Sequence, residues 1–364
     1  MKKYISIISA VVLLTVSLCA CGSISEAAAK GSSRISIVTT IFPEYDWVMN
    51  ILGNNPANAE VTMLLDNGVD LHSYQPTAED ILRISACDLF IYVGGESDEW
   101  VEDALKEATN KDMIVINLLD ELGDSVKEEE VVEGMQEDGH EHDHEEDGDH
   151  EEDGDHEEGE DHEEDEHHDH DEDEHHDHEE EGPEYDEHVW LSLRNASVLV
   201  QSIADALGKI DPENVGTYSS NVSAYKEKLS KLDEKYNKTV SEAPVKTVLF
   251  GDRFPFRYLT DDYGLDYYAA FVGCSAETEA SFETVTFLAR KVDELGLEAV
   301  LTIEGADHRI AETIVQNTAD KDQQILTMDS MQSTTSRDVA GGSDYLSIME
   351  NNLSVLTEAL KKQD

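Results

Sequence analysis

Short apolar runs alternate with longer stretches of helical periodicity in both halves of the chain. Such alternation is typical of a parallel α/β layout, in which each helix returns the chain to the next strand. The predicted strands are 34–41, 61–65, 89–93 and 113–117, and then 246–250, 267–271, 299–303 and 324–327. The predicted helices include 46–52, 77–86, 99–108, 283–295, 310–318 and 344–361. The pattern therefore predicts an α/β protein with two (β/α)-type lobes, each built on a parallel sheet.

A long polar segment with a regular apolar seam, at about 211–243, separates the two α/β patterns. The seam residues follow one another at steps of 4, 3, 4, 3 and 4: Tyr218, Val222, Tyr225, Leu229, Leu232 and Tyr236. This heptad spacing, uninterrupted by Gly or Pro between Gly216 and Pro244, predicts one helix of about 25 to 30 residues. The seam could pair two chains, but its position favours packing across both lobes of a monomer. The N-terminal lobe is then 34–210 and the C-terminal lobe 244–364.

The first twenty residues are typical of a targeting signal. Lys2 and Lys3 precede an apolar run at 5–18 that is too short for a comfortable membrane span. The run ends in Leu18-Cys19-Ala20-Cys21, which resembles the cleavage site of bacterial lipoproteins. We expect 1–20 to be removed and 21–33 to be a lipidated Cys21 with a tether, so that the exported protein is lipid-anchored to the outer face of the cell membrane. An ordinary signal peptide or an uncleaved anchor is the alternative.

Acidic residues dominate the composition, but they are unevenly distributed. The chain of 364 residues has 83 Asp+Glu against 25 Lys+Arg, a formal net charge of −58. Residues 137–181 alone contain 29 acids, 12 histidines and 4 glycines, which leaves 54 acids against 25 bases, or −29, elsewhere. A negative field of this size opposes contact with phosphate backbones, so nucleic acid is excluded as a partner. Half of the net charge therefore lies in residues 137–181, which belong to an insert in the N-terminal lobe at about 128–184.

The insert contains no apolar residue between 137 and 181, so we expect it to be disordered. Its histidines are His140, His142, His144, His150, His156, His162, His167, His168, His170, His175, His176 and His178. Imidazoles mixed with carboxylates suit Zn²⁺, and also Ni²⁺ or Cu²⁺, which predicts auxiliary low-affinity metal binding. A solvated spacer is the alternative. The H-E-x-x-H spacing that starts at His140 does not indicate a protease, because that motif needs a helix.

Outside this insert the chain has three histidines and two cysteines that could carry chemistry. His72 and His188 lie in predicted loops, each with acids just before it that could fix the tautomer of the ring. His308 opens a predicted helix, and we interpret it first as a surface residue and second as a cleft ligand. Cys87 and Cys274 could form a disulfide outside the cell, but their positions favour two buried free thiols.

The motifs around the first two histidines resemble a known family. The D-x-H-x-Y-x-P-T stretch at 70–77 and the H-V-W-L-x-x-x-N-A stretch at 188–196 are similar to the histidine motifs of zinc- and manganese-uptake solute-binding proteins of ABC transporters. A His- and acid-rich loop before the second motif is typical of the zinc branch. The resemblance runs from about Arg34 to Asp364. It implies two lobes joined by a long rigid backbone helix, a metal cleft between the lobes, and no catalysis.

The second lobe departs from the pattern of that family. Arg253 stands where the family places a third histidine, and a guanidinium cannot bind a cation. The nearest available ligand is Asp252, one residue earlier. Asp329 matches the family's carboxylate before the last helix, and Glu304, at a strand end, is a further candidate or a capping residue. The resemblance therefore implies a site of His72 and His188 completed by carboxylate oxygen from Asp329, Asp252 or Glu304.

These features predict an extracellular protein that captures Zn²⁺ between two lobes and delivers it to an ABC permease and its ATPase. The histidine-rich insert would raise the local concentration of ions near the cleft through tethering. Manganese uptake is the alternative in the same family, because similar ligands with more oxygen suit Mn²⁺. A metal-buffering surface adhesin without a transporter is another alternative. A metallohydrolase is disfavoured because no persuasive general base accompanies the ligands.

Overall fold

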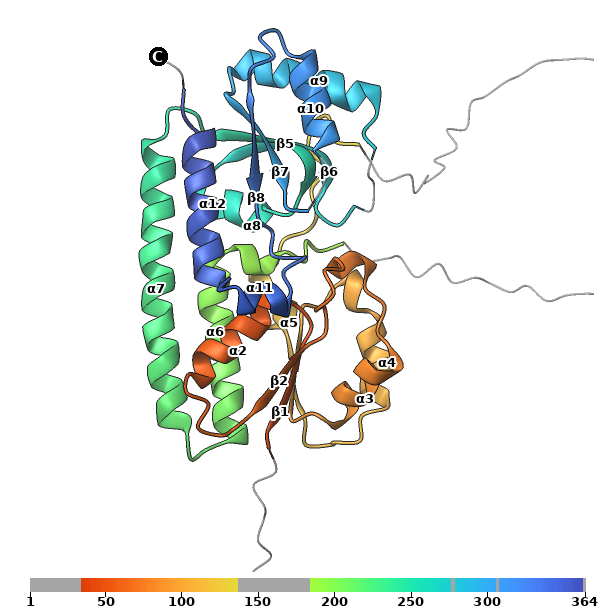
Figure 1. Cartoon of the computed structure of the whole chain (residues 1–364), viewed down its shortest axis with the longest axis vertical. Coiled ribbons are helices and arrows are strands. Elements are labelled where there is room, and N and C mark those ends of the chain that lie inside the picture. Colours follow the sequence, from red (N-terminus) through yellow and green to blue (C-terminus); the bar gives the residue numbers. More distant parts are fainter. Residues whose placement is uncertain (1–33, 137–183, 276–278, 306–307, 363–364) are drawn as a thin grey trace, which may run out of the picture.

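The computed structural model describes residues 34–136, 184–275, 279–305 and 308–362 (Figure 1). The predicted signal segment, Cys21 with its tether, and all the histidines of 137–181 lie outside these residues. The described chain forms two lobes, each on a four-stranded parallel sheet, with strand orders β2-β1-β3-β4 and β6-β5-β7-β8. Among the described helices, none has the length and apolar character that a membrane crossing requires. The predicted fold class, two α/β lobes with parallel sheets, is confirmed.

The first lobe alternates strands with helices, as the apolar pattern predicts. Its strands are β1 (Ser36–Thr39), β2 (Glu60–Met63), β3 (Leu89–Tyr92) and β4 (Ile114–Asn117). Its helices are α2 (Phe42–Leu52), α3 (Ala78–Ala86), α4 (Trp100–Lys106) and α5 (Leu118–Leu122). Each strand begins and ends within two residues of its predicted bounds. The strands are apolar runs because helices cover both faces of a parallel sheet and bury them.

The second lobe repeats this layout with one irregular strand. Its strands are β5 (Thr247–Phe254), β6 (Asp266–Val272), β7 (Ala299–Ile303) and β8 (Gln324–Met328). Its helices are α8 (Arg257–Tyr263), α9 (Phe282–Leu295), α10 (Arg309–Asn317), α11 (Ser336–Ala340) and α12 (Tyr345–Ala359). Strand β5 continues four residues past its predicted end, and its pairing with β6 shifts register between Phe250 and Arg253. Asp252 and Arg253 therefore belong to an irregular strand, whereas the sequence placed them after it.

Gly251 explains why β5 is irregular at this point. A Cβ added there would lie 2.6 Å from the Cα of Ala311, so only glycine allows β5 to pass α10 so closely. The irregular backbone at this crossing sets the directions in which the next two side chains leave the strand.

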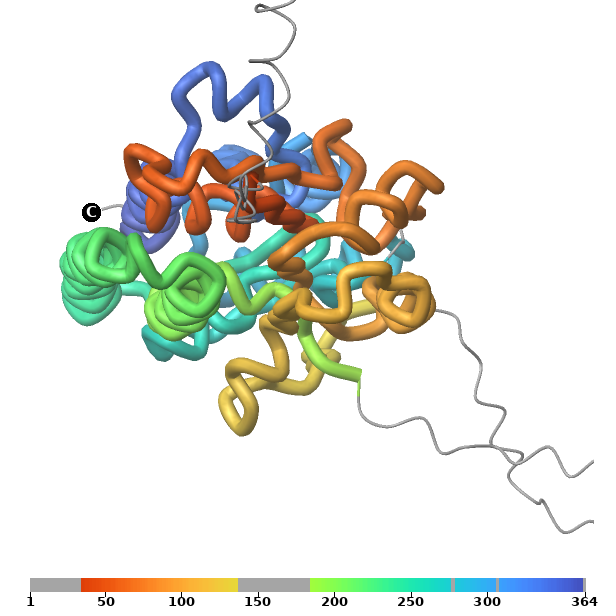
Figure 2. The backbone as a smooth tube through the Cα atoms, turned by 90° about the horizontal axis from the view of Figure 1, so that it is seen from below, coloured from red at the N-terminus to blue at the C-terminus, as the bar shows by residue number. Residues whose placement is uncertain are grey.

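Two long helices lie along one side of the molecule. Helix α6 (Leu193–Ile210), which the sequence did not predict, runs beside the first lobe, and α7 (Val215–Glu242) runs beside both lobes. Figure 1 shows α7 extending past both sheets with α12 beside it, and Figure 2 shows α6 next to α7 at one edge of the molecule. All six seam residues of α7 are buried within this chain. The Tyr225 hydroxyl donates to Asp46 (3.4 Å) and the Tyr236 hydroxyl to the Met349 carbonyl (2.7 Å), so the seam packs on both parts of one chain.

Several hydrogen bonds join the lobes where the carboxyl ends of their strands face each other. The Trp190 indole donates to the Ser330 carbonyl (2.8 Å), and the Tyr345 hydroxyl donates to the Trp190 carbonyl (2.6 Å). Residues 128–136, which the sequence assigned to the insert, pack on the second lobe, since the Gln136 amide donates to the Ala270 carbonyl (2.9 Å). The loops of both lobes thereby meet in one cleft.

Candidate metal centre

His72 enters the cleft from a short 3-10 turn, Leu71–Ser73, between β2 and α3. Asp70 caps this turn by accepting a hydrogen bond from the His72 amide (3.0 Å). On the imidazole, Nδ1 lies 2.8 Å from the Ser97 hydroxyl and 3.4 Å from Glu187 Oε2. A carboxylate beside Nδ1 favours the proton on that nitrogen and leaves the lone pair of Nε2 available.

His188 comes from the segment immediately before the 3-10 turn Val189–Leu191, and its side chain is fully buried. Asp186 accepts from the His188 backbone amide (2.9 Å) and lies 3.1 Å from Nδ1 of the same residue. This carboxylate orients the ring and favours Nε2 as the free nitrogen. The sequence expected the preceding acids to fill this role, and Asp186 does so. For His72, in contrast, the acid at Nδ1 is Glu187 and not the preceding Asp70.

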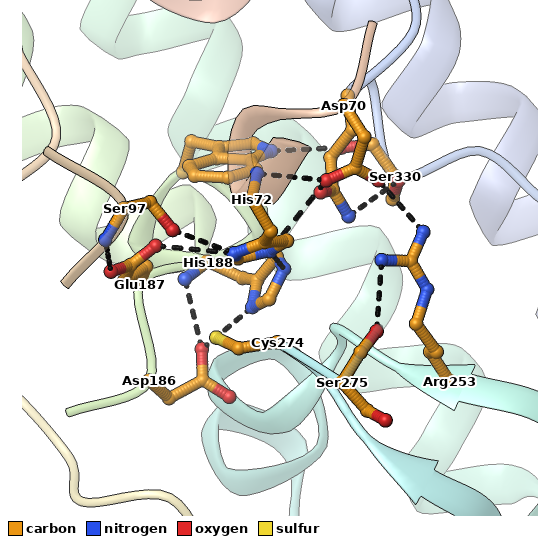
Figure 3. Close-up of polar contacts among 12 residues, drawn as sticks. Asp70, His72, Ser97, Asp186, Glu187, His188, Arg253, Cys274, Ser275 and Ser330 are labelled. Atoms are coloured by element: carbon orange, nitrogen blue, oxygen red, sulfur yellow. Dashed lines mark hydrogen bonds and ion pairs between the residues drawn. The ribbon is translucent and has the colours of Figure 1, made fainter. Parts of the chain in front are cut away.

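The two imidazoles point toward each other (Figure 3), with Nε2 of His72 3.2 Å from Nε2 of His188. Zinc bonds nitrogen at about 2.0–2.1 Å, and tetrahedral angles then separate two nitrogen ligands by about 3.3 Å. The observed spacing therefore fits a single ion between the two rings. The structure brings together the two histidines that the sequence selected, although they lie more than a hundred residues apart.

A third donor beside the imidazoles comes from the second lobe. Cys274 follows β6, and within the described residues it joins His72 and His188 in a group whose donor atoms all lie within 4.8 Å of one another. An added Cβ at the preceding Gly273 would lie 2.8 Å from Cε1 of His188, so glycine lets this loop rest against the ring. Cys274 and Cys87 are both free, as expected, but Cys274 is only partly buried.

The three carboxylates predicted to complete the site do not join this group. Asp252 accepts from the Arg253 amide (2.9 Å) and the Ile303 amide (3.3 Å). Glu304 accepts from the Ser330 amide (2.6 Å) and hydroxyl (2.7 Å), and Asp329 accepts from the Met331 amide (2.8 Å). Each of these carboxylates thus accepts from at least one backbone amide of the second lobe, which stabilises the chain around it.

Arg253 and His308 also lie in or beside the cleft without contributing a donor to this group. The Arg253 guanidinium pairs with Asp70 (2.7 Å) and donates to the Ser275 carbonyl (3.3 Å), so it bridges the two lobes. His308 occupies the N-cap position of α10 without a side-chain cap hydrogen bond and is half-buried rather than exposed. Burial raises the pKa of Asp252, although hydrogen bonds from the Arg253 and Ile303 amides and the charge of Arg253 oppose this.

Nearby charges and hydrogen bonds outweigh the effect of burial at two ionisable groups of the first lobe, His188 and Glu187. Burial alone would lower the pKa of His188, but Asp186, Glu187 and Asp70 raise it above its ordinary value. Burial likewise opposes ionisation of Glu187, yet His72 and Ser97 hold its pKa below the ordinary value. The Glu187 carboxylate beside Nδ1 of His72 thus remains ionised, which keeps that ring in an orientation suited to a cation.

A cavity of about 260 Å³ opens onto His72 and Cys274. Four glutamates line it: Glu96, Glu129, Glu184 and Glu187. Burial, followed by the charges of Glu184 and Glu187, raises the pKa of Glu96. This acidic cavity provides an approach to the imidazoles that attracts cations and repels anions.

Two α/β lobes with parallel sheets, joined by a long helix and carrying converging imidazoles between them, define a two-lobed solute-binding protein of the metal-uptake class. The family described as "Zinc-uptake complex component A periplasmic" matches residues 37–359, and the chain belongs to this family. The family resemblance inferred from the histidine motifs is confirmed. The chain is not an enzyme, as predicted, because this family supplies the binding component of a transport system.

Curated relatives and solved structures agree with this assignment. The chain is 28% identical over 327 residues to the zinc-binding protein AdcA of Streptococcus pyogenes, covering 89% of this chain and 55% of AdcA. It is 27% identical over 347 residues to the high-affinity zinc uptake system protein ZnuA of Bacillus subtilis, covering 95% and 94% of the two chains. The chain thus spans little more than half of that AdcA but nearly all of ZnuA.

The solved structures include one with zinc bound. The Zn(II)-bound ZnuA-like domain of Streptococcus pneumoniae AdcA superposes with a TM-score of 0.63 at 25% identity, covering 90% of this chain and 100% of that domain. The metal-dependent lipoprotein YcdH of Bacillus subtilis superposes with a TM-score of 0.65 at 23% identity, covering 90% and 99%. The second likeness shows the fold alone. The predicted zinc cargo agrees with the metal bound in the first.

Proposed function

We propose that this protein captures Zn²⁺ in the extracellular space and delivers it to an ABC permease for zinc import. A cytoplasmic ATPase would drive the permease, and a lipid on Cys21 would hold the monomeric protein at the outer face of the membrane. The observation that carries the proposal is the pair of Nε2 atoms 3.2 Å apart, each on a ring held through Nδ1. The family and the zinc-binding names of AdcA and ZnuA support it.

The donors in the cleft favour zinc over manganese. His72 and His188 provide imidazole nitrogen, which suits Zn²⁺, whereas Mn²⁺ prefers sites rich in oxygen. Asp252, Glu304 and Asp329 each accept from backbone amides, and none of the three lies in the described group of converging donors. This arrangement disfavours the oxygen-rich site that the manganese alternative requires.

We also propose that the histidine-rich tract, residues 137–181, collects zinc loosely and raises its concentration near the cleft. The tract combines twelve imidazoles with 29 carboxylates. Glu184, the first residue described after the tract, lines the acidic cavity that opens onto His72. Ions released from a tethered chain at this point would meet the cleft at high effective concentration.

Binding is tested by titrating the protein from Gly22 onward with Zn²⁺ and with Mn²⁺, alongside His72→Ala and a deletion of residues 137–181. We expect one tight zinc site that His72→Ala removes and the deletion leaves in place, with weaker additional binding lost in the deletion. Tight binding that survives His72→Ala, or that vanishes with the tract, would refute the assignment of the cleft. A tight site for Mn²⁺ that excludes Zn²⁺ would establish the manganese alternative.

Delivery is tested in cells that lack the gene for this protein. We expect slow growth in chelated, zinc-poor medium, rescued by added zinc or by the wild-type gene but not by His72→Ala. Equal rescue by the two genes would mean that the cleft does not supply zinc to the cell. Unimpaired growth of the deleted strain, together with normal zinc uptake, would favour a metal-buffering adhesin.

A further inference from the structure

We propose that Cys274 is the ligand that the second lobe contributes, as a thiolate, to the ion held by His72 and His188. It would replace the imidazole that the family pattern places at the position of Arg253. This inference rests on the proposed function, because it adds a ligand to the same site. It departs from the sequence-based expectation of a carboxylate from the second lobe.

The first argument is the position of the sulfur. Cys274 Sγ and one ring nitrogen each of His72 and His188 lie within 4.8 Å of one another. With Zn–S bonds of about 2.3 Å and Zn–N bonds of about 2.05 Å, tetrahedral geometry separates sulfur from nitrogen by about 3.5 Å. The two nitrogens are already at the required spacing. The thiol needs to approach by about 1.3 Å at most, which is within the reach of a side-chain rotation and a small loop shift.

The second argument is that the backbone around Cys274 packs against His188 and the wall of the acidic cavity. Gly273 packs on the His188 ring so closely that a Cβ there would lie 2.8 Å from Cε1 and 3.0 Å from Nδ1. The Cys274 amide donates to Glu129 (3.2 Å), a residue of the acidic cavity wall. Figure 3 shows the thiol beside the two rings, at the end of the loop that leaves β6. These contacts hold the residue where its sulfur faces the imidazoles.

The third argument is that Arg253 takes a different role at the position of the absent histidine. Its guanidinium pairs with Asp70, which caps the His72 turn, and donates to the carbonyl of Ser275. One side chain therefore connects the loop that carries His72 with the loop that carries Cys274. Arg253 acts as a positioning residue. The metal ligand that a guanidinium cannot supply is available from Cys274, the neighbour of Ser275.

A thiolate at this position would sharpen the choice of metal. Ligation breaks the S–H bond, forms a metal–sulfur bond and releases the proton to solvent. Thiolate is a soft ligand that favours Zn²⁺ and other thiophilic ions, and it is unsuited to Mn²⁺. Cys274 would therefore set the metal selectivity of the site, and Cd²⁺ would be the strongest competitor of Zn²⁺.

X-ray absorption of the zinc-loaded protein from Gly22 onward provides a direct test, because Cys87 and Cys274 are its only cysteines. We expect one sulfur at about 2.3 Å in the parent protein. Cys274→Ser should lose that sulfur and bind zinc at least about 10-fold more weakly, because loss of a ligand costs at least as much as loss of a partner that supports a ligand. Cys87→Ala, the matched control, removes a thiol in the first lobe and should keep both the sulfur and the affinity.

Cobalt gives an independent readout. The Co²⁺-loaded parent and Cys87→Ala should show a near-ultraviolet sulfur-to-cobalt charge-transfer band, and Cys274→Ser should not. Circular dichroism and thermal melting of the metal-free variants establish that each is folded. Tight zinc binding that depends on His72 but shows no sulfur ligand would overturn this inference and leave the proposed function standing. Absence of tight zinc binding in the parent protein would overturn both.

Discussion

The two lobes contribute polar side chains to the same cleft in different ways. The first lobe presents His72 and His188 with their Nδ1 atoms already held and their Nε2 atoms 3.2 Å apart. In the second lobe, the carboxylates of Asp252, Glu304 and Asp329 accept hydrogen bonds from backbone amides. A residue type suited to metal binding is therefore a weak guide to a ligand. What matters is whether its donor atom converges with others, as those of His72, His188 and Cys274 do.

This difference also appears in the charge states. Contacts with His72 and Ser97 hold the pKa of Glu187 down in spite of burial, whereas burial raises the pKa of Asp252 and Asp329. The acid beside Nδ1 of His72 is thus ionised, while burial opposes ionisation of Asp252 and Asp329 in the second lobe. We therefore expect zinc capture to begin on the first lobe, where His72 and His188 are already oriented and little conformational entropy is lost on binding.

The largest expected effect comes from removing a candidate ligand of the first lobe, and it is compared with removal of a candidate ligand of the second lobe. We expect His188→Ala to weaken zinc binding by more than about 100-fold, because losing a ligand costs more than losing its supporting partner. Asp252→Asn should change the affinity by less than about threefold, since Asp252 lies outside the group of converging donors and the amide oxygen can still accept from one of the two backbone amides, that of Arg253 or that of Ile303. Competition with a chromophoric chelator measures both. A loss in Asp252→Asn equal to that in His188→Ala would restore a carboxylate of the second lobe as a ligand.

An intermediate effect should come from the acid that supports His188. Asp186→Asn keeps the shape of the side chain but removes the charge that lies 3.1 Å from Nδ1. We expect zinc affinity to fall by about 10-fold, because such supporting partners typically contribute 10- to 100-fold. Asp262→Asn is the control, since this carboxylate of the second lobe accepts from the Ser192 hydroxyl instead. Equal losses in the two variants would mean that general charge, rather than support of the ring, sets the affinity.

The sequence predicted the lobes, the strands and the two histidines because each leaves a local signal. Apolar runs bounded by turns mark buried parallel strands, and the spacing around His72 and His188 carries the family motifs. The role proposed for Cys274 had no such signal, since its approach to His188 depends on how the loop after β6, in the second lobe, packs against the first lobe. The hydrogen-bond partners of Asp252, Glu304 and Asp329 could not be predicted either, because they depend on which backbone amides face these carboxylates in the folded chain. Helix α6 was missed although Ser192 supplies its N-cap, accepting from the Asn195 amide.

The smallest effect concerns stability in the second lobe. Burial, aided by the charge of Glu304, raises the pKa of Asp329 from 3.8 to about 7. The folded state therefore holds a proton that the unfolded state releases between these values, and stability falls as the pH rises through this window. Asp329→Asn removes this dependence and keeps an oxygen for the Met331 amide. We expect the metal-free variant to be more stable than its parent at pH 8 by about 1 kcal/mol, because partial exposure reduces the effect, and to lose this advantage near pH 4.

Asp338→Asn provides the control of opposite sign. Its hydrogen bonds from Thr335 lower the pKa of Asp338, so ionisation of this carboxylate accompanies folding and the variant should gain no stability at pH 8. Urea denaturation of both metal-free variants at pH 4.5 and pH 8 separates the two cases. A gain at pH 8 in Asp329→Asn alone would show that this buried carboxylate opposes folding when charged, which agrees with a loop-holding role. No gain would mean that Asp329 is ionised and stabilised in the free protein, and thus available to a cation as the sequence suggested.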